Sequence, residues 1–267
     1  MIIHVKLIVN IMKKSFQLLL FLAFAGLIAL SSCNNDDDDN GNEPTPSEPE
    51  VRVQFDFVFG QNALPFSLGE TFVHPRTGDT LSFHEFKFYL SNVKLRRTDG
   101  SFWEEAESYH LVCTDCPNQQ FFIIENLPAG EYDQMTYVLG VDSARNVSGA
   151  QTGELSPSRG MFWDWNNGYI MLKAEGHSRN SKDSTFAFHL GGFSGDIDIV
   201  TQKVADFEQT LKVENGTSKT LNFIANPARL WHNSPGLEDR NTIHMPGPAA
   251  AQMGRDFFDN VSYVGME

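Results

Sequence analysis

The chain of 267 residues has few cysteines, few tryptophans and a deficit of positive charge. It contains 3 cysteines and 4 tryptophans, and 20 lysines and arginines stand against 34 aspartates and glutamates, a formal net charge of −14. Lys6, Lys13 and Lys14 lie in an N-terminal targeting segment, and without them 17 basic residues remain, a formal charge of −17. Such an acidic chain argues against nucleic acid or anionic membrane surfaces as partners, because like charges repel.

The motifs of common enzymes are absent from the sequence as well. There is no Gly-x-Ser-x-Gly nucleophile motif, no His-Glu-x-x-His zinc motif and no glycine-rich phosphate loop. Acidic residues are so numerous that choosing any two as a glycosidase pair would be arbitrary. We therefore expect a protein that is not an enzyme.

The only long apolar run spans residues 16–30 and is too short for a comfortable transmembrane helix. Lys13 and Lys14 precede it, and Leu30-Ser31-Ser32-Cys33 follows it. A basic segment, an apolar stretch and small residues before a cysteine are typical of a bacterial lipoprotein signal peptide. We predict a signal peptide over residues 1–32, with Met12 as an alternative start, and Cys33 as the lipidated first residue of the mature protein.

Residues 33–50 carry almost nothing that a core could bury. Four consecutive aspartates, Asp36 to Asp39, are followed by a stretch rich in proline and glutamate. Like charges without apolar residues predict a disordered tether. An acidic run directly after a lipidated cysteine resembles the surface-export signal of Bacteroidetes lipoproteins, and an ordinary solvated linker explains it equally well. The expected location is the outer membrane, facing either the periplasm or the cell surface.

Residues 51–267 have the two-residue periodicity of β-strands and predict a single domain. Val51, Val53 and Phe55 alternate with polar residues, which is typical of a half-buried strand. Further strands are expected at 81–95, 121–124, 132–141, 169–175, 185–190, 197–200, 209–213 and 220–225, separated by Gly and Asn turns. Only residues 249–260 have helical periodicity. We predict an all-β fold, an antiparallel β-sandwich of immunoglobulin-like or jelly-roll-like type, with a short C-terminal helix.

A predicted hairpin between Gly160 and Gly192 sets the direction of one histidine. Its apolar residues alternate along two strands: Ile170, Leu172 and Ala174 in the first, and Phe186, Phe188 and Leu190 in the second. The two sets should share one face, because a one-residue slip would expose one of them entirely. His189 then points away from the hydrophobic layer. Its neighbours on that face would be Tyr169, Met171 and Lys173.

Three other histidines have informative neighbours in the sequence. His84 lies where the alternation slips between Phe83 and Phe86, which indicates a turn or a β-bulge. His177 is expected at the start of the hairpin loop. His244 precedes Met245 in a loop ahead of the C-terminal helix. A structural role is the default for any one histidine, because metal binding requires ligands that converge in space.

Cys113 and Cys116 form a Cys-x-x-Cys pair without a second pair. An exported protein is in an oxidising compartment, which favours a disulfide. Zinc would need two further ligands at suitable spacing, and a thioredoxin-like role would need a βαβ setting. We predict a disulfide that closes a small loop.

Trp163 and Trp165 are two residues apart, and in an extended chain both side chains would project to the same side. One interpretation is an aromatic plug at the end of the sandwich, since tryptophan is foremost a large buried residue. The other is participation in a redox or metal site. The residues by themselves leave both interpretations open.

Several blocks taken together resemble the MbnP-like family of copper-binding proteins. They are Phe86–Val93 (FKFYLSNV), Pro128–Tyr132 (PAGEY), Leu139–Asp142 (LGVD), Gly160–Tyr169 (GMFWDWNNGY), Lys173–Gly176 (KAEG) and Phe188–Gly192 (FHLGG). The Tyr-Leu-Ser-Asn and Trp-x-Trp-x-x-Gly-Tyr blocks are specific, whereas the Pro-Ala-Gly turn is not. The cysteine pair is an addition to the family pattern.

This resemblance implies a β-sandwich-like periplasmic or surface protein that holds copper for acquisition or storage. It implies His189 as a ligand, with His244 as a weaker assignment, and either Trp163 or Trp165 as a residue oxidised to kynurenine. It also implies a dihaem cytochrome c peroxidase-like partner and a TonB-dependent receptor. Imidazole beside a soft neighbour such as Met245 or Met171 suits Cu(I).

Two other functions remain compatible with the sequence. The protein could be a surface-lipoprotein module that binds a nutrient or glycan, with Trp163, Trp165 and Tyr169 as a stacking platform. It could also be a structural component of the cell surface without any ligand. Copper retained after purification would separate the first function from both.

Overall fold

The computed structural model describes residues 48–116, 119–164 and 166–267. Cys33, the expected signal peptide and most of the expected tether lie outside these residues, and so does Trp165. None of the helices in the described part of the chain is long and apolar enough to cross a membrane.

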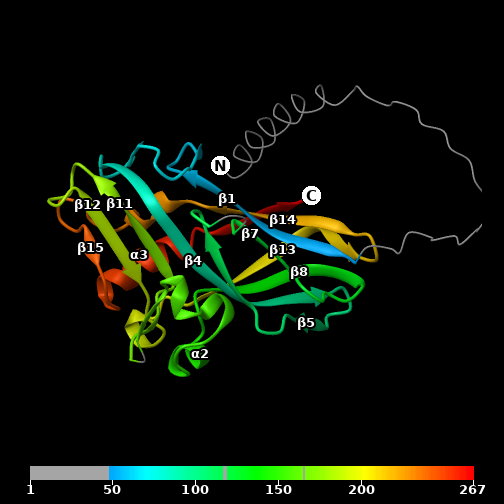
Figure 1. The fold of residues 1–267 in the computed structure, drawn as a ribbon. Coiled ribbons are helices and arrows are strands. Elements are labelled where there is room, and N and C mark those ends of the chain that lie inside the picture. The colour runs from blue at the N-terminus through cyan, green and yellow to red at the C-terminus, as the bar shows by residue number, and fades with distance from the viewer. Residues whose placement is uncertain (1–47, 117–118, 165) are drawn as a thin grey trace, which may run out of the picture. The chain divides into compact units, whose positions relative to one another are not determined.

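The described residues form two large β-sheets and a short ribbon (Figure 1). One sheet has the order β16 (Ser262–Met266), β14 (Ser218–Ala225), β1 (Glu50–Phe59) and β2 (Leu64–Pro65), and β7 (Phe121–Ile123) also pairs with β1. The other has the order β13 (Thr201–Val213), β8 (Gly130–Leu139), β4 (Thr80–Arg97), β11 (Leu172–Ser178), β12 (Thr185–Leu190) and β15 (Thr242–Ile243). Its long strand β4 also pairs with β3 (Phe72–Val73), β5 (Phe102–Glu104) and β6 (Tyr109–Cys113). The ribbon consists of β9 (Phe162–Asp164) and β10 (Gly168–Tyr169).

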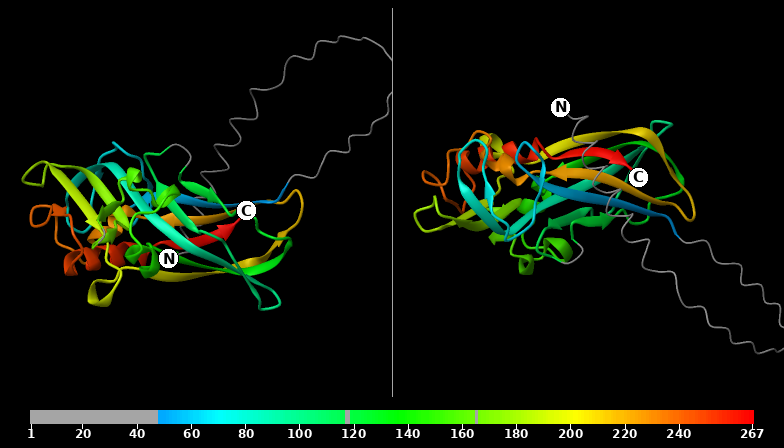
Figure 2. Two further views of the ribbon diagram at one scale, coloured as in Figure 1. Left: turned by 60° about the horizontal axis from the view of Figure 1, so that its bottom comes forward. Right: turned by 90° about the horizontal axis from the view of Figure 1, so that it is seen from above.

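The prediction of an all-β sandwich with a short helix near the C-terminus is confirmed. The helix is α3 (Pro248–Phe258), and the chain's first described strand lies in one layer with its last, as Figure 2 shows for β1, β14 and β16. Most strand pairs are antiparallel as expected, but both large sheets are mixed, because β1 runs parallel to β14 and β12 runs parallel to β15. Parallel neighbours need long crossover connections, and each of these pairs joins segments far apart in the sequence.

The main core is built from aromatic side chains of both sheets. Phe55 of β1 meets Phe88 of β4 with ring centroids 5.4 Å apart. Helix α3 adds Phe257, whose ring lies 5.2 Å from Phe86 and 5.4 Å from Phe88. Each fully buried side chain of this kind contributes about 2 kcal/mol by leaving water. The helix therefore covers the inner face of β4, and its outer face is left for other side chains.

Strand β4 contains the bulge that the slip in the sequence indicated. Its register with β11 shifts so that Glu175 lies opposite Glu85 and Gly176 lies opposite Phe83. Phe83 and Phe86 both point into the core at 1% and 0% exposure. The bulge adds one residue between them, and that residue is His84, which is exposed.

Gly176 is required at this point because its neighbours leave no space for a side chain. A Cβ atom there would lie 2.1 Å from the carbonyl oxygen of Ser82 and 2.5 Å from the ring of Phe186. Gly176→Ala is expected to lower the free energy of unfolding by about 2–3 kcal/mol, measured by chemical denaturation. Gly247→Ala is the matched control, since a Cβ at Gly247 would have nothing within 4 Å. Equal stability of the two variants would contradict this tight contact.

The predicted register of the hairpin is confirmed. Leu172 pairs with Leu190 and Ala174 pairs with Phe188, so that Lys173 lies opposite His189. The first strand is nevertheless interrupted, because Ile170 donates its N–H to the carbonyl of Met161, just before β9, whereas Met171 donates to Leu190 in the sheet. The alternation breaks at this step. Met171 is therefore fully buried in the main core, and the prediction that it shares the face of His189 is wrong.

Candidate metal centre

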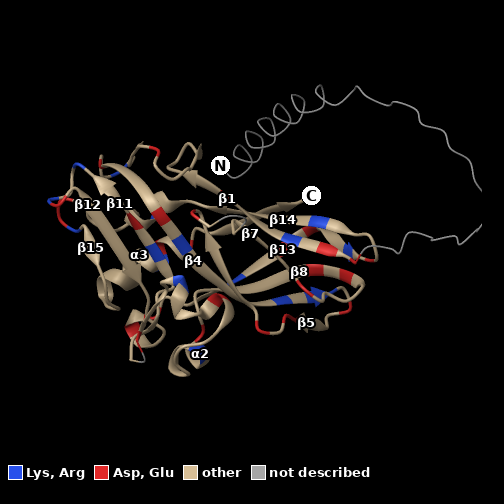
Figure 3. Cartoon of the chain, viewed as in Figure 1, with Lys and Arg blue, Asp and Glu red and all other residues tan. Residues whose placement is uncertain are grey.

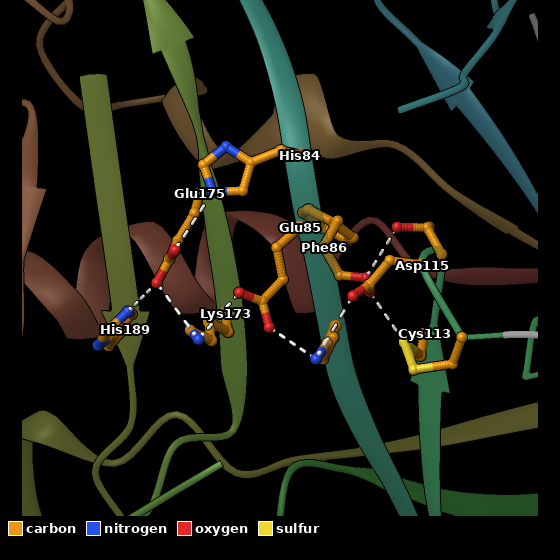
Figure 4. Close-up of polar contacts among 11 residues, drawn as sticks. His84, Glu85, Phe86, Cys113, Asp115, Lys173, Glu175 and His189 are labelled. Carbon is orange, nitrogen blue, oxygen red and sulfur yellow. Dashed lines mark hydrogen bonds and ion pairs between the residues drawn. A yellow bond between two sulfur atoms is a disulfide. The ribbon is translucent and has the colours of Figure 1, made fainter. Parts of the chain in front are cut away.

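His189 lies on β12 and points to the outer face of the nine-stranded sheet. Its Nε2 is 2.7 Å from Oε1 of Glu175, and its side chain is 20% exposed. Figure 4 shows the pair in front of the sheet, with a helix behind it. Glu175 comes from the neighbouring strand β11, two residues beyond Lys173, so the period of two places both on this face.

His244 lies beside His189 because of the parallel pairing of β12 with β15. Phe188 pairs with Ile243, so the next residue of each strand extends the same register. The two imidazole rings have centroids 4.9 Å apart and planes inclined at 63°. His244 is exposed at the surface. The two histidines singled out from the sequence are therefore neighbours in space.

The carboxylate of Glu175 determines which nitrogen of His189 carries the proton. Burial acts to raise the pKa of Glu175, but the hydrogen bond from His189 and the charge of Lys173 outweigh it and lower the pKa to about 2. An ionised carboxylate can only accept, so His189 donates through Nε2. Burial lowers the pKa of His189 below 6.5, against the raising effect of Glu175. Neutral His189 then has its lone pair on Nδ1, the arrangement found in histidine ligands of metals.

A row of alternating charges holds Glu175 in place. Lys173 Nζ lies 3.3 Å from Glu175 and 2.9 Å from Glu85, and Lys87 Nζ lies 2.6 Å from Glu85 and 3.6 Å from Asp115. Figure 3 shows blue and red residues alternating on the strands β11 and β4, and Figure 4 shows the contacts. Both lysines are between carboxylates. The row therefore orients Glu175, the hydrogen-bond partner of His189, and Lys173 lies directly opposite His189 in the strand pairing.

Trp163 lies on β9, and its six-membered ring packs against Gly191. A Cβ atom at Gly191 would lie 2.6 Å from Cζ3 of Trp163, so the ring occupies the space of the missing side chain. Gly191 follows His189 by two residues, the spacing that puts two positions on one face of an extended chain. The half-buried indole has a buried Nε1 with no hydrogen-bond partner among the described residues. Trp231 in the main core shares that feature, so the position beside Gly191 is what distinguishes Trp163.

The blocks that resemble the family build a second apolar cluster on this outer face. Tyr89 and Tyr169 pack edge to face at 6.1 Å, and the Tyr89 hydroxyl donates to the carbonyl of Glu154. Asn146 of α2 (Ser143–Val147) accepts from the backbone of Tyr169 at 2.8 Å and donates to Val141 at 2.7 Å. These contacts fix the ribbon on the sheet. Several residues of the family-specific blocks therefore have a structural role in this cluster, and the same contacts position Trp163.

The cysteine pair forms a disulfide at the end of β6. Cys113 and Cys116 have Cα atoms 5.4 Å apart, next to Asp115. Among the described residues this is the one set of three His, Cys, Asp or Glu ligand atoms that all lie within 4.8 Å of one another. Sulfurs bonded to each other have no thiolate to offer, and a metal ligand needs the thiolate.

The roles of Glu175 and Lys173 were not predicted from the sequence, although both residues lie in the block Lys173–Gly176. The sequence did contain a usable signal. Lys173 lies opposite His189, and Glu175 is two residues further along the same strand, so both side chains are on the face of His189. Asn146 had no signal in the sequence. Its contacts join residues from separate loops.

The fold and the geometry of the site define a class of protein: a β-sandwich with two adjacent imidazoles on the outer face of one sheet. The chain belongs to the MbnP family, whose family model matches residues 48–245. The fold is also similar to a solved structure, MbnP from Methylosinus trichosporium, with a TM-score of 0.50 and 14% identity, covering 70% of this chain and 79% of that one. No curated protein matches the sequence.

Proposed function

We propose that the protein is an extracytoplasmic copper-binding protein with its centre at His189 and His244, acting in copper acquisition or storage. The observation that carries the proposal is the adjacency of the two rings, 4.9 Å apart, in a chain that belongs to the MbnP family. Imidazole nitrogens suit copper, and Nδ1 of neutral His189 has a lone pair to offer. The copper-related role follows from family membership, and the residues are our assignment.

The donor set explains why a further ligand of another kind is needed. No third His, Cys, Asp or Glu among the described residues joins His189 and His244 within 4.8 Å. Trp163 lies against Gly191 with a buried, unpartnered nitrogen. Intact indole only donates a hydrogen bond. Oxidation by two equivalents of peroxide would break the C2–C3 bond of the indole and add one oxygen atom to each carbon, giving N-formylkynurenine and two water molecules. Hydrolysis of the formamide by water would then release C2 as formate and leave kynurenine, whose aniline nitrogen and ketone oxygen can coordinate.

The Cu(I) oxidation state is proposed on the strength of Met245. Met245 follows His244 and is 53% exposed, and a thioether is a soft ligand that favours Cu(I). Met171 is withdrawn from this role, because it is buried in the main core.

Location and partners are extensions of the same proposal. Lipidation at Cys33 would anchor the protein in the outer membrane, facing the periplasm or the cell surface, at the end of an acidic tether. A dihaem cytochrome c peroxidase-like protein would supply the oxidation of tryptophan, and a TonB-dependent receptor would be the transport partner. The formal charge of −17 on the mature chain supports an environment of cations and no nucleic acid partner.

The glycan-binding alternative is weakened by the position of Tyr169. Its side chain is fully buried, and its hydroxyl donates to the carbonyl of Leu155 at 3.0 Å. A stacking platform must be exposed to its ligand. One of the three aromatic residues considered for the platform therefore has no open face.

Copper titration of His189→Ala tests the proposal. The affinity is expected to fall more than about 100-fold, beyond the 10- to 100-fold loss typical of an outer-shell residue. His244→Ala should lose affinity as well, whereas His232→Ala, an exposed histidine outside the centre, should not. Unimpaired copper binding by His189→Ala would refute the site, and no copper in wild-type protein from its native host would support a structural protein without a ligand.

A further inference from the structure

A second pair of histidines lies on the same face as the candidate centre. The rings of His84 and His177 have centroids 5.4 Å apart, and both side chains are exposed. Figure 4 shows His84 next to Glu175. Close packing does not force two exposed imidazoles together. The backbone positions of His84 and His177 therefore determine how close the two rings are.

Two features of the sheet bring these residues together. His84 is the bulged residue of β4, and the bulge turns its side chain outward between two phenylalanines that point inward. His177 lies within β11, opposite Ser82 of β4, and not at the start of a loop as its sequence position suggested. The two strands thus present one imidazole each on the outer face.

Glu175 connects this pair to the candidate centre. Its Oε2 is 3.4 Å from Nε2 of His84, and its Oε1 is 2.7 Å from Nε2 of His189. The carboxylate therefore lies between the two histidine pairs, and the ammonium group of Lys173, 3.3 Å from its Oε1, holds it there. An anionic oxygen beside two imidazoles favours a cation there.

We propose that His84 and His177 form a second, solvent-facing metal site that takes a divalent ion with a preference for imidazole, Cu(II) foremost. Imidazole nitrogens suit copper, zinc and nickel, and Cu(II) binds most tightly among the divalent ions of this series. Water would complete its coordination, since a hollow of about 330 Å³ opens beside His177, with Ser82 and Thr80 among its hydroxyl lining. This site does not rest on the proposed copper centre.

The site should be weaker than the candidate centre. Arg179 also lines the hollow, and its guanidinium donates to the hydroxyl of Thr80, which puts a positive charge near His177. Exposed ligands are also screened by water and salt. We expect a dissociation constant for Cu(II) at least tenfold higher than that of the His189–His244 centre, which makes the second pair an exchangeable site.

Cu(II) titration of the mature full-length chain, followed by electron paramagnetic resonance, tests this proposal. The His189–His244 centre favours Cu(I), but its imidazoles also bind Cu(II), so wild-type protein titrated under oxidising conditions should bind two Cu(II) ions with distinct spectra. His84→Ala and His177→Ala should each lose the weaker signal and keep the stronger one. His232→Ala serves as the matched control for an exposed histidine that has no imidazole neighbour within the described residues. All of these positions are exposed, so folding should be unaffected, which circular dichroism verifies.

The outcomes separate the two proposals. Loss of the weaker site in both single variants, with His232→Ala unchanged, supports the second site. The second site would be refuted if His84→Ala and His177→Ala both kept two bound Cu(II) ions. It would also be refuted if the protein bound one Cu(II) ion that only His189→Ala removed. In both cases the copper centre would stand. One site that depends on His84 and His177 but not on His189 would support the second site and refute the centre.

Discussion

Trp163→Phe is expected to lower the copper affinity of protein isolated from its native host at least about 100-fold, as the loss of a ligand should. The aromatic ring of Trp163 lies against Gly191, two residues beyond His189 in the sequence, and the proposal takes the opened indole of this residue as the further ligand. Phenylalanine keeps much of the packing but cannot yield an aniline nitrogen. Wild-type protein made without the oxidising partner should therefore bind as weakly as the variant.

Mass spectrometry of the peptide that contains residues 160–170 provides the direct measurement. Kynurenine differs from tryptophan by the net replacement of one carbon atom by oxygen. Trp103→Phe, at a half-buried tryptophan of β5, is the matched control and should keep the affinity. Trp165→Phe tests the neighbouring residue in the same way. Tight stoichiometric copper in the Trp163→Phe, Trp165→Phe double variant would rule out a ligand derived from tryptophan.

Glu175→Gln should weaken both copper binding and the fold. Glutamine keeps the size of the side chain but removes the charge that pairs with Lys173 and accepts from His189. Because an outer-shell partner of a histidine ligand orients the ring, copper affinity should fall about 10- to 100-fold. The free energy of unfolding at pH 7 should fall by about 1–2 kcal/mol, since solvent screening reduces the value of the charge.

The effect of Glu175→Gln on stability should depend on pH in a defined direction. The folded chain holds the pKa of Glu175 at about 2, below its ordinary 4.5. A lowered pKa stabilises the fold above the unfolded value and loses that contribution as the pH falls toward the folded value. The difference in stability between wild type and variant, measured by denaturation, should thus be constant above pH 4.5 and shrink between 4.5 and 2.

Glu105→Gln is the matched control for this change. Glu105 accepts from His110 at 2.7 Å, the same kind of pair in another part of the molecule. The control should leave copper affinity intact. An equal loss of affinity in both variants would show that Glu175 has no particular relation to the centre.

The periodicity of the sequence predicted the local structure well where burial alternates strictly. The strand that starts near Val51, the hairpin register and the bulge after Phe83 all follow from which residues must face the core. Residues 197–200 were predicted as a strand and are not one. Ile197 ends a 3₁₀ turn, and Ile199 is buried against Gly254 of α3, where a Cβ would lie 2.9 Å from it. The sequence of a short apolar run does not distinguish a strand of a sheet from an irregular segment that is buried against a helix.

By itself, the sequence determined the all-β class, the outward direction of His189 and the family, because these depend on local alternation and on contiguous blocks of residues. Only the tertiary structure decided which ligands meet. His244 reaches His189 through the parallel pairing of β15 with β12, and His84 reaches His177 through the bulge combined with the register of β4 and β11. Pairing between distant strands depends on how the whole chain buries its apolar faces, so no local pattern encodes these neighbours.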